Sequence, residues 1–241
     1  PLQLATGYAL LANGGYRVEP HLIQRVENLE GEVAFEARPL TVCPDCDLLD
    51  MPQGPDGEMT MEAIMAAENS EAPQFPPAPR VQDARVNYVI DSILKDVIKH
   101  GTGRRALVLE RSDIAGKTGT TNGPMDVWFS GYNQAVVTTV WVGFDNYTPL
   151  GRKEFGGTAA LPIWIQYMRT ALKDSPQVER PVPPGIVTVK IDPDNGLLAA
   201  PGQRNAIFEY FLQGSVPQQT GRGQSNSSGD SDISDQINDI L

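Results

Sequence analysis

The 241-residue sequence contains only two cysteines and two histidines, which limits the metal and redox chemistry open to it. Both cysteines fall in Cys43-Pro44-Asp45-Cys46, a spacing that fits a local disulfide, half of a zinc site or a thioredoxin-like redox pair. A redox pair needs a strand-to-helix setting, which the proline-rich surroundings do not provide. A zinc site needs four ligands, and only His21 and His100 could add nitrogen donors. A local disulfide or free thiols are therefore favoured over a metal site.

Basic residues are missing from a long interior stretch. No Lys or Arg lies between Pro39 and Pro79, whereas acidic residues are dense there and return in the C-terminal tail, so the formal net charge is -11. Nucleic-acid binding depends on neutralising phosphates with Lys and Arg, and no nucleic-acid partner is therefore expected. The basic residues gather instead around Lys117, and an anionic ligand is expected there. They are Arg104, Arg105, Arg111, Arg152 and Lys153.

Long apolar runs are also missing. No apolar segment approaches the roughly 20 residues that a membrane-spanning helix needs, and no signal peptide opens the chain. The apolar content of 40% is still sufficient for a real core. Because the first residue is Pro1 and not Met, we expect the chain to be part of a longer protein.

The segment from Ile114 to Gly123 holds the most specific chemistry in the chain. If Lys117-Thr118-Gly119-Thr120 is a strand, Thr118 and Thr120 point to one face and Lys117 to the other. Gly119 has no side chain, so a ligand backbone can approach closely there. These features favour a docking edge for an extended peptide that ends in a carboxylate. The alternative is an ordinary strand end with small polar residues, because such short motifs recur by chance.

The flanking segments indicate that this motif lies in a sheet. Residues 127–132 and 136–143 are β-branched and aromatic runs separated by a short turn, which predicts an antiparallel hairpin. Residues 83–100 have apolar residues at three- and four-residue spacing, which predicts a helix that stops at Gly101-Thr102-Gly103. The fold class predicted is α+β, an antiparallel sheet flanked by helices.

Three of these segments together resemble a known family. They are Gly-Thr-Gly-Arg-Arg-Ala from residue 101, Ala-Gly-Lys-Thr-Gly-Thr-Thr from residue 115 and Asp-Val-Trp-Phe-Ser-Gly-Tyr from residue 126. They resemble the C-terminal half of the transpeptidase domain of bifunctional (class A) penicillin-binding proteins. The resemblance implies the penicillin-binding protein/β-lactamase-like fold and no metal or organic cofactor.

The domain organisation expected has three parts. Residues 1–175 form the C-terminal half of a transpeptidase domain, with an acidic, proline-rich insertion at 38–80. Residues 176–217 form a small β-hairpin extension, in which 186–191 pairs with 197–199 around an Asp194-Asn195-Gly196 turn. Residues 218–241 form a disordered acidic tail.

Two helices carry further predictions. In the helix from Asp83, Ser92 and Lys95 fall on the polar side, facing away from the core. The stripe expected to be buried consists of Val86, Val89, Ile90, Ile93, Leu94, Val97 and Ile98. Ser92 and Lys95 match Ser-x-x-Lys, the nucleophile motif of the superfamily, but we do not expect Ser92 to be the nucleophile. A second helix after Thr158 is expected to bury one face. The residues of that face are Ala160, Ile163, Trp164, Tyr167, Met168 and Ala171.

The resemblance also implies roles for individual residues. Lys117 would supply positive potential and orient the proton relay, and the Thr120 N–H would be one of two oxyanion-hole donors. The Thr118 and Thr120 hydroxyls would hold the substrate carboxylate, with Gly119 and Thr121 in the same substrate-binding strand. Asp126 and Trp128 are expected to support this strand and not to take part in the chemistry.

The family activity is cross-linking of peptidoglycan stem peptides by serine acyl transfer, with β-lactams as inhibitors. The expected partners are stem peptides, their lipid-linked precursor and β-lactams, and the expected location is the periplasmic face of the inner membrane. No Ser-x-Asn occurs, and no Ser-x-x-Lys lies at the proper place. Both are expected in a preceding segment, so the chain alone should be inactive. The alternatives are a β-lactamase or D,D-carboxypeptidase, and a non-catalytic peptide-binding scaffold.

Overall fold

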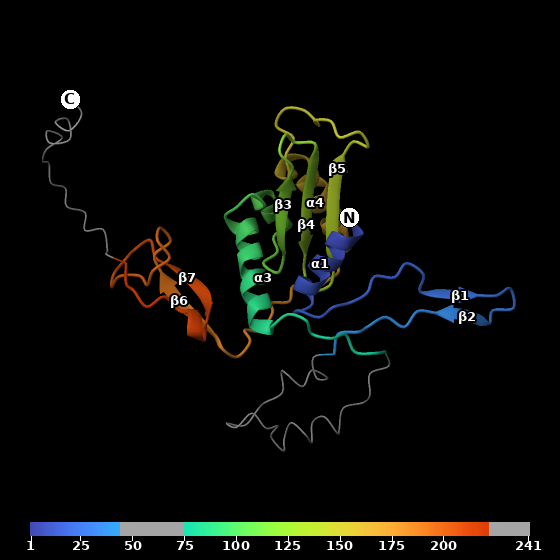
Figure 1. Ribbon diagram of the computed structural model, residues 1–241, viewed down its shortest axis with the longest axis horizontal. Helices are drawn as coiled ribbons and strands as arrows, with labels where there is room; N and C mark the ends of the chain where they lie inside the picture. Colours follow the sequence, from blue (N-terminus) through green and yellow to red (C-terminus); the bar gives the residue numbers. More distant parts are fainter. Residues whose placement is uncertain (44–74, 222–241) are drawn as a thin grey trace, which may run out of the picture. The chain divides into compact units, whose positions relative to one another are not determined.

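The computed structural model describes residues 1–43 and 75–221, and the chain divides into two compact units, Pro1–Gly185 and Ile186–Leu241. The larger unit is built on an antiparallel sheet with strand order β3-β4-β5 (Figure 1). The strands are β3 (Ala115–Thr120), β4 (Asp126–Tyr132) and β5 (Val137–Gly143). The predicted hairpin and the predicted α+β class are confirmed.

Helices cover both faces of this sheet. Val127 and Phe129 point to one face and pack against α4 (Leu161–Ala171), where the rings of Phe129 and Trp164 lie 4.9 Å apart. Tyr132 points to the opposite face, because its position in β4 differs by an odd number of residues. There it packs against α1 (Leu2–Ala12) beside Ala12. Figure 1 shows α1 in front of the sheet and α4 behind it.

Helix α3 (Ala84–Lys99) begins at Asp83, whose side chain accepts a hydrogen bond from the Arg85 N–H. The prediction of its buried face is partly wrong: Ile98 of the expected stripe lies in the core and Leu94 packs against buried residues, but other members of the stripe do not. Asn87, Tyr88, Asp91 and Ile98 are the buried residues of α3, whereas Val86 and Ile93 of the predicted stripe are 38% and 57% exposed. The polar side faces the unit because its side chains find specific partners there: the Tyr132 hydroxyl donates to Asp91 Oδ1 at 2.9 Å.

The face predicted for the helix after Thr158 is also partly wrong. Ala160, Trp164 and Met168 are buried as expected, but Ile163 and Tyr167 are 50% and 55% exposed. Leu161 and Ile165 are buried in their place. This helix carries apolar residues on both sides, and the π-helical turn η3 (Gly156–Ala160) that precedes α4 changes its rotational phase. Periodicity alone could not choose between the two faces.

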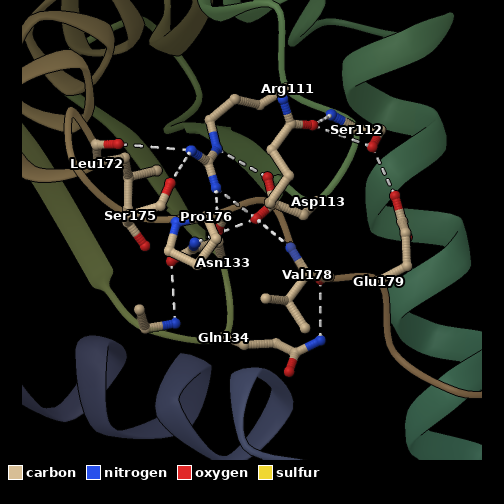
Figure 2. A network of polar contacts seen from close by, with 12 residues as sticks. Arg111, Ser112, Asp113, Asn133, Gln134, Leu172, Ser175, Pro176, Val178 and Glu179 are labelled. Atoms are coloured by element: carbon tan, nitrogen blue, oxygen red, sulfur yellow. Dashed lines mark hydrogen bonds and ion pairs between the residues drawn. The ribbon is translucent and has the colours of Figure 1, made fainter.

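A buried ion pair holds the segment after α4 against the rest of the larger unit (Figure 2). Arg111 donates to both carboxylate oxygens of Asp113, at 2.8 and 2.7 Å, and also to the backbone carbonyl of Ser175 at 2.9 Å. Asp113 accepts further bonds from the Asn133 side chain and the Val178 N–H. Burial raises the pKa of Asp113, but the bonds from Arg111 and Asn133 outweigh it, so the pKa is lower than usual.

Farther along the same segment, Arg180 joins α1 to α3. Its guanidinium donates to the carbonyls of Leu11 and Ala12, at 3.0 and 2.6 Å, and to the Asn87 side chain. The two carbonyls belong to the last turn of α1, where helical hydrogen bonding leaves acceptors unpaired. Residues 175–180 therefore belong to the larger unit, which places the division after Gly185 and not after residue 175.

The described residues before α3 include a small hairpin of β1 (Arg25–Glu27) and β2 (Val33–Glu36) whose residues are all exposed. Most of the expected insertion, residues 44–74, lies outside the described part of the chain. Cys43 is disulfide-bonded, and Cys46 lies among the residues not described. Within residues 1–43 and 75–221, no helix is both long and apolar enough to cross a membrane.

In the smaller unit, β6 (Ile186–Ile191) pairs with β7 (Ile207–Leu212) along its whole length. The predicted pairing of 186–191 with 197–199 is therefore wrong, apart from a single bridge between Ile191 and Leu198. Residues 207–212 are the longer aromatic and β-branched run, so they offer more cross-strand packing. Of the expected disordered tail, residues 222–241 lie outside the described residues.

Candidate functional site

The motif that begins at Lys117 lies on β3, one of the two edge strands of the described sheet β3-β4-β5. Thr118 is opposite Phe129 and Thr120 is opposite Val127, so both hydroxyls are on the face that packs against α4. Lys117 is opposite Ser130 and points to the other face. The motif therefore presents a cation on one side of the strand and hydroxyls on the other.

Backbone groups of this strand point outward. The Thr121 N–H donates to the Asp126 carbonyl at 3.0 Å. In an antiparallel pair, hydrogen-bonded and non-hydrogen-bonded positions alternate, so the next pair, Thr120 with Val127, is non-hydrogen-bonded. The N–H groups of Thr120 and Thr118 accordingly point away from β4, toward the outer edge. A ligand on that edge would find two backbone donors two residues apart.

The Lys117 side chain bends over this same edge. It is exposed, and its Nζ donates to the Thr118 carbonyl at 3.0 Å and lies 3.4 Å from Thr118 Oγ1. None of the carboxylates in the described part of the chain forms an ion pair with it. The ammonium charge is thus available to an anionic ligand.

Both hydroxyls on β3 have partners from other elements. Thr118 Oγ1 lies 2.7 Å from the hydroxyl of Thr102, in the turn after α3, and the Gly156 N–H donates to Thr120 Oγ1 at 3.1 Å. Gly156 opens η3 and touches the sheet so closely that a Cβ there would lie 2.4 Å from the Trp128 carbonyl oxygen. Only glycine fits at this contact.

Thr121, Asp126 and Trp128 lie beside the edge. The Thr121 hydroxyl accepts bonds from the N–H groups of Met125 and Asp126, at 3.3 and 3.0 Å, and so closes the turn between β3 and β4. Asp126 Oδ1 accepts from the Trp141 indole at 2.8 Å, and the rings of Trp128 and Trp141 lie 6.1 Å apart. This cluster stiffens the end of the hairpin behind Thr120.

Thr102 and Gly156 are the residues of this site that sequence reasoning missed. Each lies in a glycine-rich turn, the first in Gly101-Thr102-Gly103 and the second beside Gly157. The only signal for them was the concentration of glycine, which marks close backbone approach but does not say to what. Their position at β3 depends on contacts between segments distant in the chain.

The Ser92/Lys95 pair does not form a reactive site. Lys95 is only 15% exposed in its side chain and forms ion pairs with Asp91 at 3.3 Å and Glu179 at 3.0 Å. Burial lowers the pKa of Lys95, but these two carboxylates outweigh it, and the pKa is raised overall. A lysine held charged in this way is a poor base for Ser92. Among the residues with described positions, no cluster of metal-ligating side chains occurs either.

Comparison with known proteins agrees with this geometry. Residues 1–168 match the family described as the penicillin binding protein transpeptidase domain, and residues 182–221 match the penicillin-binding protein 1A C-terminal domain. Penicillin-binding protein 1A of Pseudomonas aeruginosa is 47% identical over 230 residues, covering 90% of this chain and 28% of that protein. The Escherichia coli protein of the same name is 36% identical over 268 residues, covering 91% of this chain and 31% of that protein.

A solved structure is similar as well. The crystal structure of penicillin-binding protein 1A from Haemophilus influenzae has a TM-score of 0.76 and 35% identity, and covers 92% of this chain and 33% of that one. This chain thus spans about a third of the length of the relatives that it matches. The motif on β3, the fold around it and these matches agree: the chain belongs to the penicillin-binding protein transpeptidase family.

Proposed function

We propose that this chain carries the substrate-binding edge of a peptidoglycan D,D-transpeptidase. The observation that carries the proposal is the outer edge of β3, where a lysine that forms no ion pair with any described residue and two threonine hydroxyls flank backbone N–H groups that point outward. A peptide ending in a carboxylate needs a cation, hydroxyl donors and main-chain donors along one line. The edge presents all three within four residues, Lys117 to Thr120.

Each residue of this edge has a proposed role. Lys117 stabilises negative charge in the transition state and orients the proton relay, and the Thr120 N–H donates to the oxyanion. The Thr118 and Thr120 hydroxyls bind the terminal carboxylate, while Gly119 lets the substrate backbone lie against the strand. The Thr121 hydroxyl, with Asp126 and Trp128, keeps the end of the strand in place.

The nucleophile is proposed to lie in a segment that precedes this chain. Ser-x-x-Lys and Ser-x-Asn are absent at suitable places, and Lys95 is held between two carboxylates. Val86 and Ile93 on α3 are exposed among the described residues, which supports a further segment packing there. Such a segment would bring the serine to the open edge of β3.

The proposed partners follow from this activity. They are peptidoglycan stem peptides, their lipid-linked precursor and, as inhibitors, β-lactams. The whole protein would act at the periplasmic face of the cytoplasmic membrane, where these substrates are found. No nucleic-acid partner is proposed, because the chain has a net charge of -11.

Intact mass after incubation with benzylpenicillin tests the proposal. We expect a penicilloyl adduct on the longer protein that includes the preceding segment, located on that segment, and no adduct on this chain alone. Lys117→Met in the longer protein should slow the adduct formation roughly 100-fold or more, because a main electrostatic contribution at the reacting centre is lost. Lys173→Met, an exposed lysine after α4, is the matched control and should have no effect.

Two results would contradict the proposal. An adduct on the isolated chain would place the nucleophile within it. Absence of an adduct on the longer protein would favour a peptide-binding scaffold. The lifetime of the adduct separates the remaining alternative, since a β-lactamase releases the penicilloyl group rapidly and a transpeptidase retains it.

A further inference from the structure

The two hydroxyls of the β3 edge are both bonded by groups outside the strand. Thr102 lies in the turn three residues after the end of α3, and its hydroxyl oxygen is 2.7 Å from that of Thr118. Gly156 opens η3 and places its N–H 3.1 Å from Thr120 Oγ1. The edge is therefore shaped by three segments that are far apart in the sequence, and neither hydroxyl is left to rotate freely.

The bond to Thr120 has only one possible direction. A backbone N–H can only donate, so Thr120 Oγ1 is the acceptor from Gly156, and the hydroxyl proton must point elsewhere. Gly156 is buried, and a Cβ at this position would meet backbone oxygens at 2.4 and 2.7 Å. The contact that makes Thr120 Oγ1 an acceptor, and leaves its proton for another partner, is thus part of the packing between η3 and the sheet.

A similar argument applies to Thr118. The ammonium of Lys117 lies 3.4 Å from Thr118 Oγ1 and can only donate. The Thr102 hydroxyl can either donate or accept. If a ligand takes the Thr118 proton, Thr102 must become the donor, because Thr118 has only one proton to give. Thr118 then accepts two bonds, its lone pairs are both used, and its proton is directed to the ligand.

We propose that Thr102 and Gly156 are positioning residues that hold the Thr118 and Thr120 hydroxyls as hydrogen-bond donors, and so make the β3 edge selective for a carboxylate over a neutral ester or amide. The inference rests on the proposed transpeptidase function and deepens it. A carboxylate has only acceptors and benefits from two aligned donors and a nearby cation. A neutral ester attracts the lysine and the aligned hydroxyls much less.

Thr102 is the better residue to test, because a side chain at Gly156 would displace the sheet. Thr102 is exposed, and Thr102→Val keeps its shape but removes the hydroxyl, whereas Thr102→Ser retains the hydroxyl. The matched control is Thr139→Val, which removes another hydroxyl pair of the same sheet: Thr139 lies on β5, two strands away from β3, and its hydroxyl is 3.0 Å from that of Ser130 on β4. All variants are made in the longer protein that includes the preceding segment.

The measurement is the second-order rate constant of acylation by benzylpenicillin, which has a free carboxylate, and by its methyl ester. We expect Thr102→Val to slow the reaction with benzylpenicillin about 5- to 30-fold, less than the roughly 12- to 160-fold for complete loss of a hydrogen bond to a charged group, because the bond is weakened and not removed. The slower reaction with the ester should change less than about twofold, within the scatter of a substitution that touches no ligand. Thr102→Ser should restore the benzylpenicillin rate, and Thr139→Val should leave both rates unchanged.

The two ideas fail in different ways. Suppose that wild type is acylated by benzylpenicillin, but Thr102→Val slows acylation by benzylpenicillin and by the ester equally, or slows neither reaction. The proposed function then stands, and the inference on hydroxyl direction is wrong. If serine does not restore the rate, a merely steric role for Thr102 explains the loss, and the inference is again wrong. If wild type forms no adduct with either compound, the proposed function is refuted, and this inference with it.

Discussion

Replacing Asp113 with alanine should destabilise the larger unit by about 3 kcal/mol, the lower end of the range for breaking a buried ion pair. The side chains of Asp113 and Arg111 are only 2% and 10% exposed. The variant removes the carboxylate that accepts from Arg111, Asn133 and the Val178 N–H. The lower end applies because Arg111 still donates to three backbone carbonyls.

Thermal unfolding measures this loss. For a unit of this size, 3 kcal/mol corresponds to a fall in Tm of roughly 6–12 °C. The matched control is Asp96→Asn, because the exposed pair of Asp96 with Lys99 is 3.8 Å long and should contribute less than about 0.5 kcal/mol. The double variant Arg111→Met/Asp113→Leu should be more stable than Asp113→Ala, since it leaves no unpaired buried charge.

The same pair predicts a pH dependence. The pKa of Asp113 is lower in the folded protein than its ordinary value, even though burial by itself raises it. A lowered pKa adds stability above the unfolded value of about 3.9, and this stability disappears as pH falls through the folded pKa. The difference in free energy of unfolding between wild type and Asp113→Ala should therefore become smaller below about pH 4. If Asp113→Ala lowers the free energy of unfolding at pH 7 by less than about 1 kcal/mol, the size expected of an exposed ion pair, the reasoning is refuted.

Three further predictions concern other contacts. Arg180→Met should lower the free energy of unfolding by about 2 kcal/mol, because it removes the charged donor that binds the end of α1 and Asn87. It should also speed amide hydrogen exchange in α1, and unchanged exchange rates there would contradict this prediction. Trp141→Phe should lower the free energy of unfolding, measured by urea titration, by no more than about 1 kcal/mol, because only one hydrogen bond to Asp126 is lost; a larger loss would show that the ring packing matters more. Lys117→Met should leave Tm within about 2 °C of wild type, as an exposed lysine, while impairing acylation; a large fall in Tm would make its role structural.

Local pattern was sufficient to predict the elements that carry the site. Alternation in residues 126–143 predicts the β4–β5 hairpin, and the spacing after Asp83 predicts α3, because these periods are properties of the backbone itself. The order of Lys117, Thr118 and Thr120 along one strand likewise determines which side chains share a face. These conclusions need no knowledge of what packs against the strand.

Tertiary packing decided which face of each helix is buried and what reaches the edge of β3. Helix α3 turns its polar side inward because Tyr132 and Arg180 bind it there, and sequence periodicity contains no information about those partners. Thr102 and Gly156 meet β3 only through the folding of distant turns. Hydrophobic pattern is a property of one segment, whereas a hydrogen bond between segments depends on where both of them lie. For this chain the sequence was sufficient to locate the strand proposed to bind the substrate, and only the folded structure revealed the groups that contact its hydroxyls.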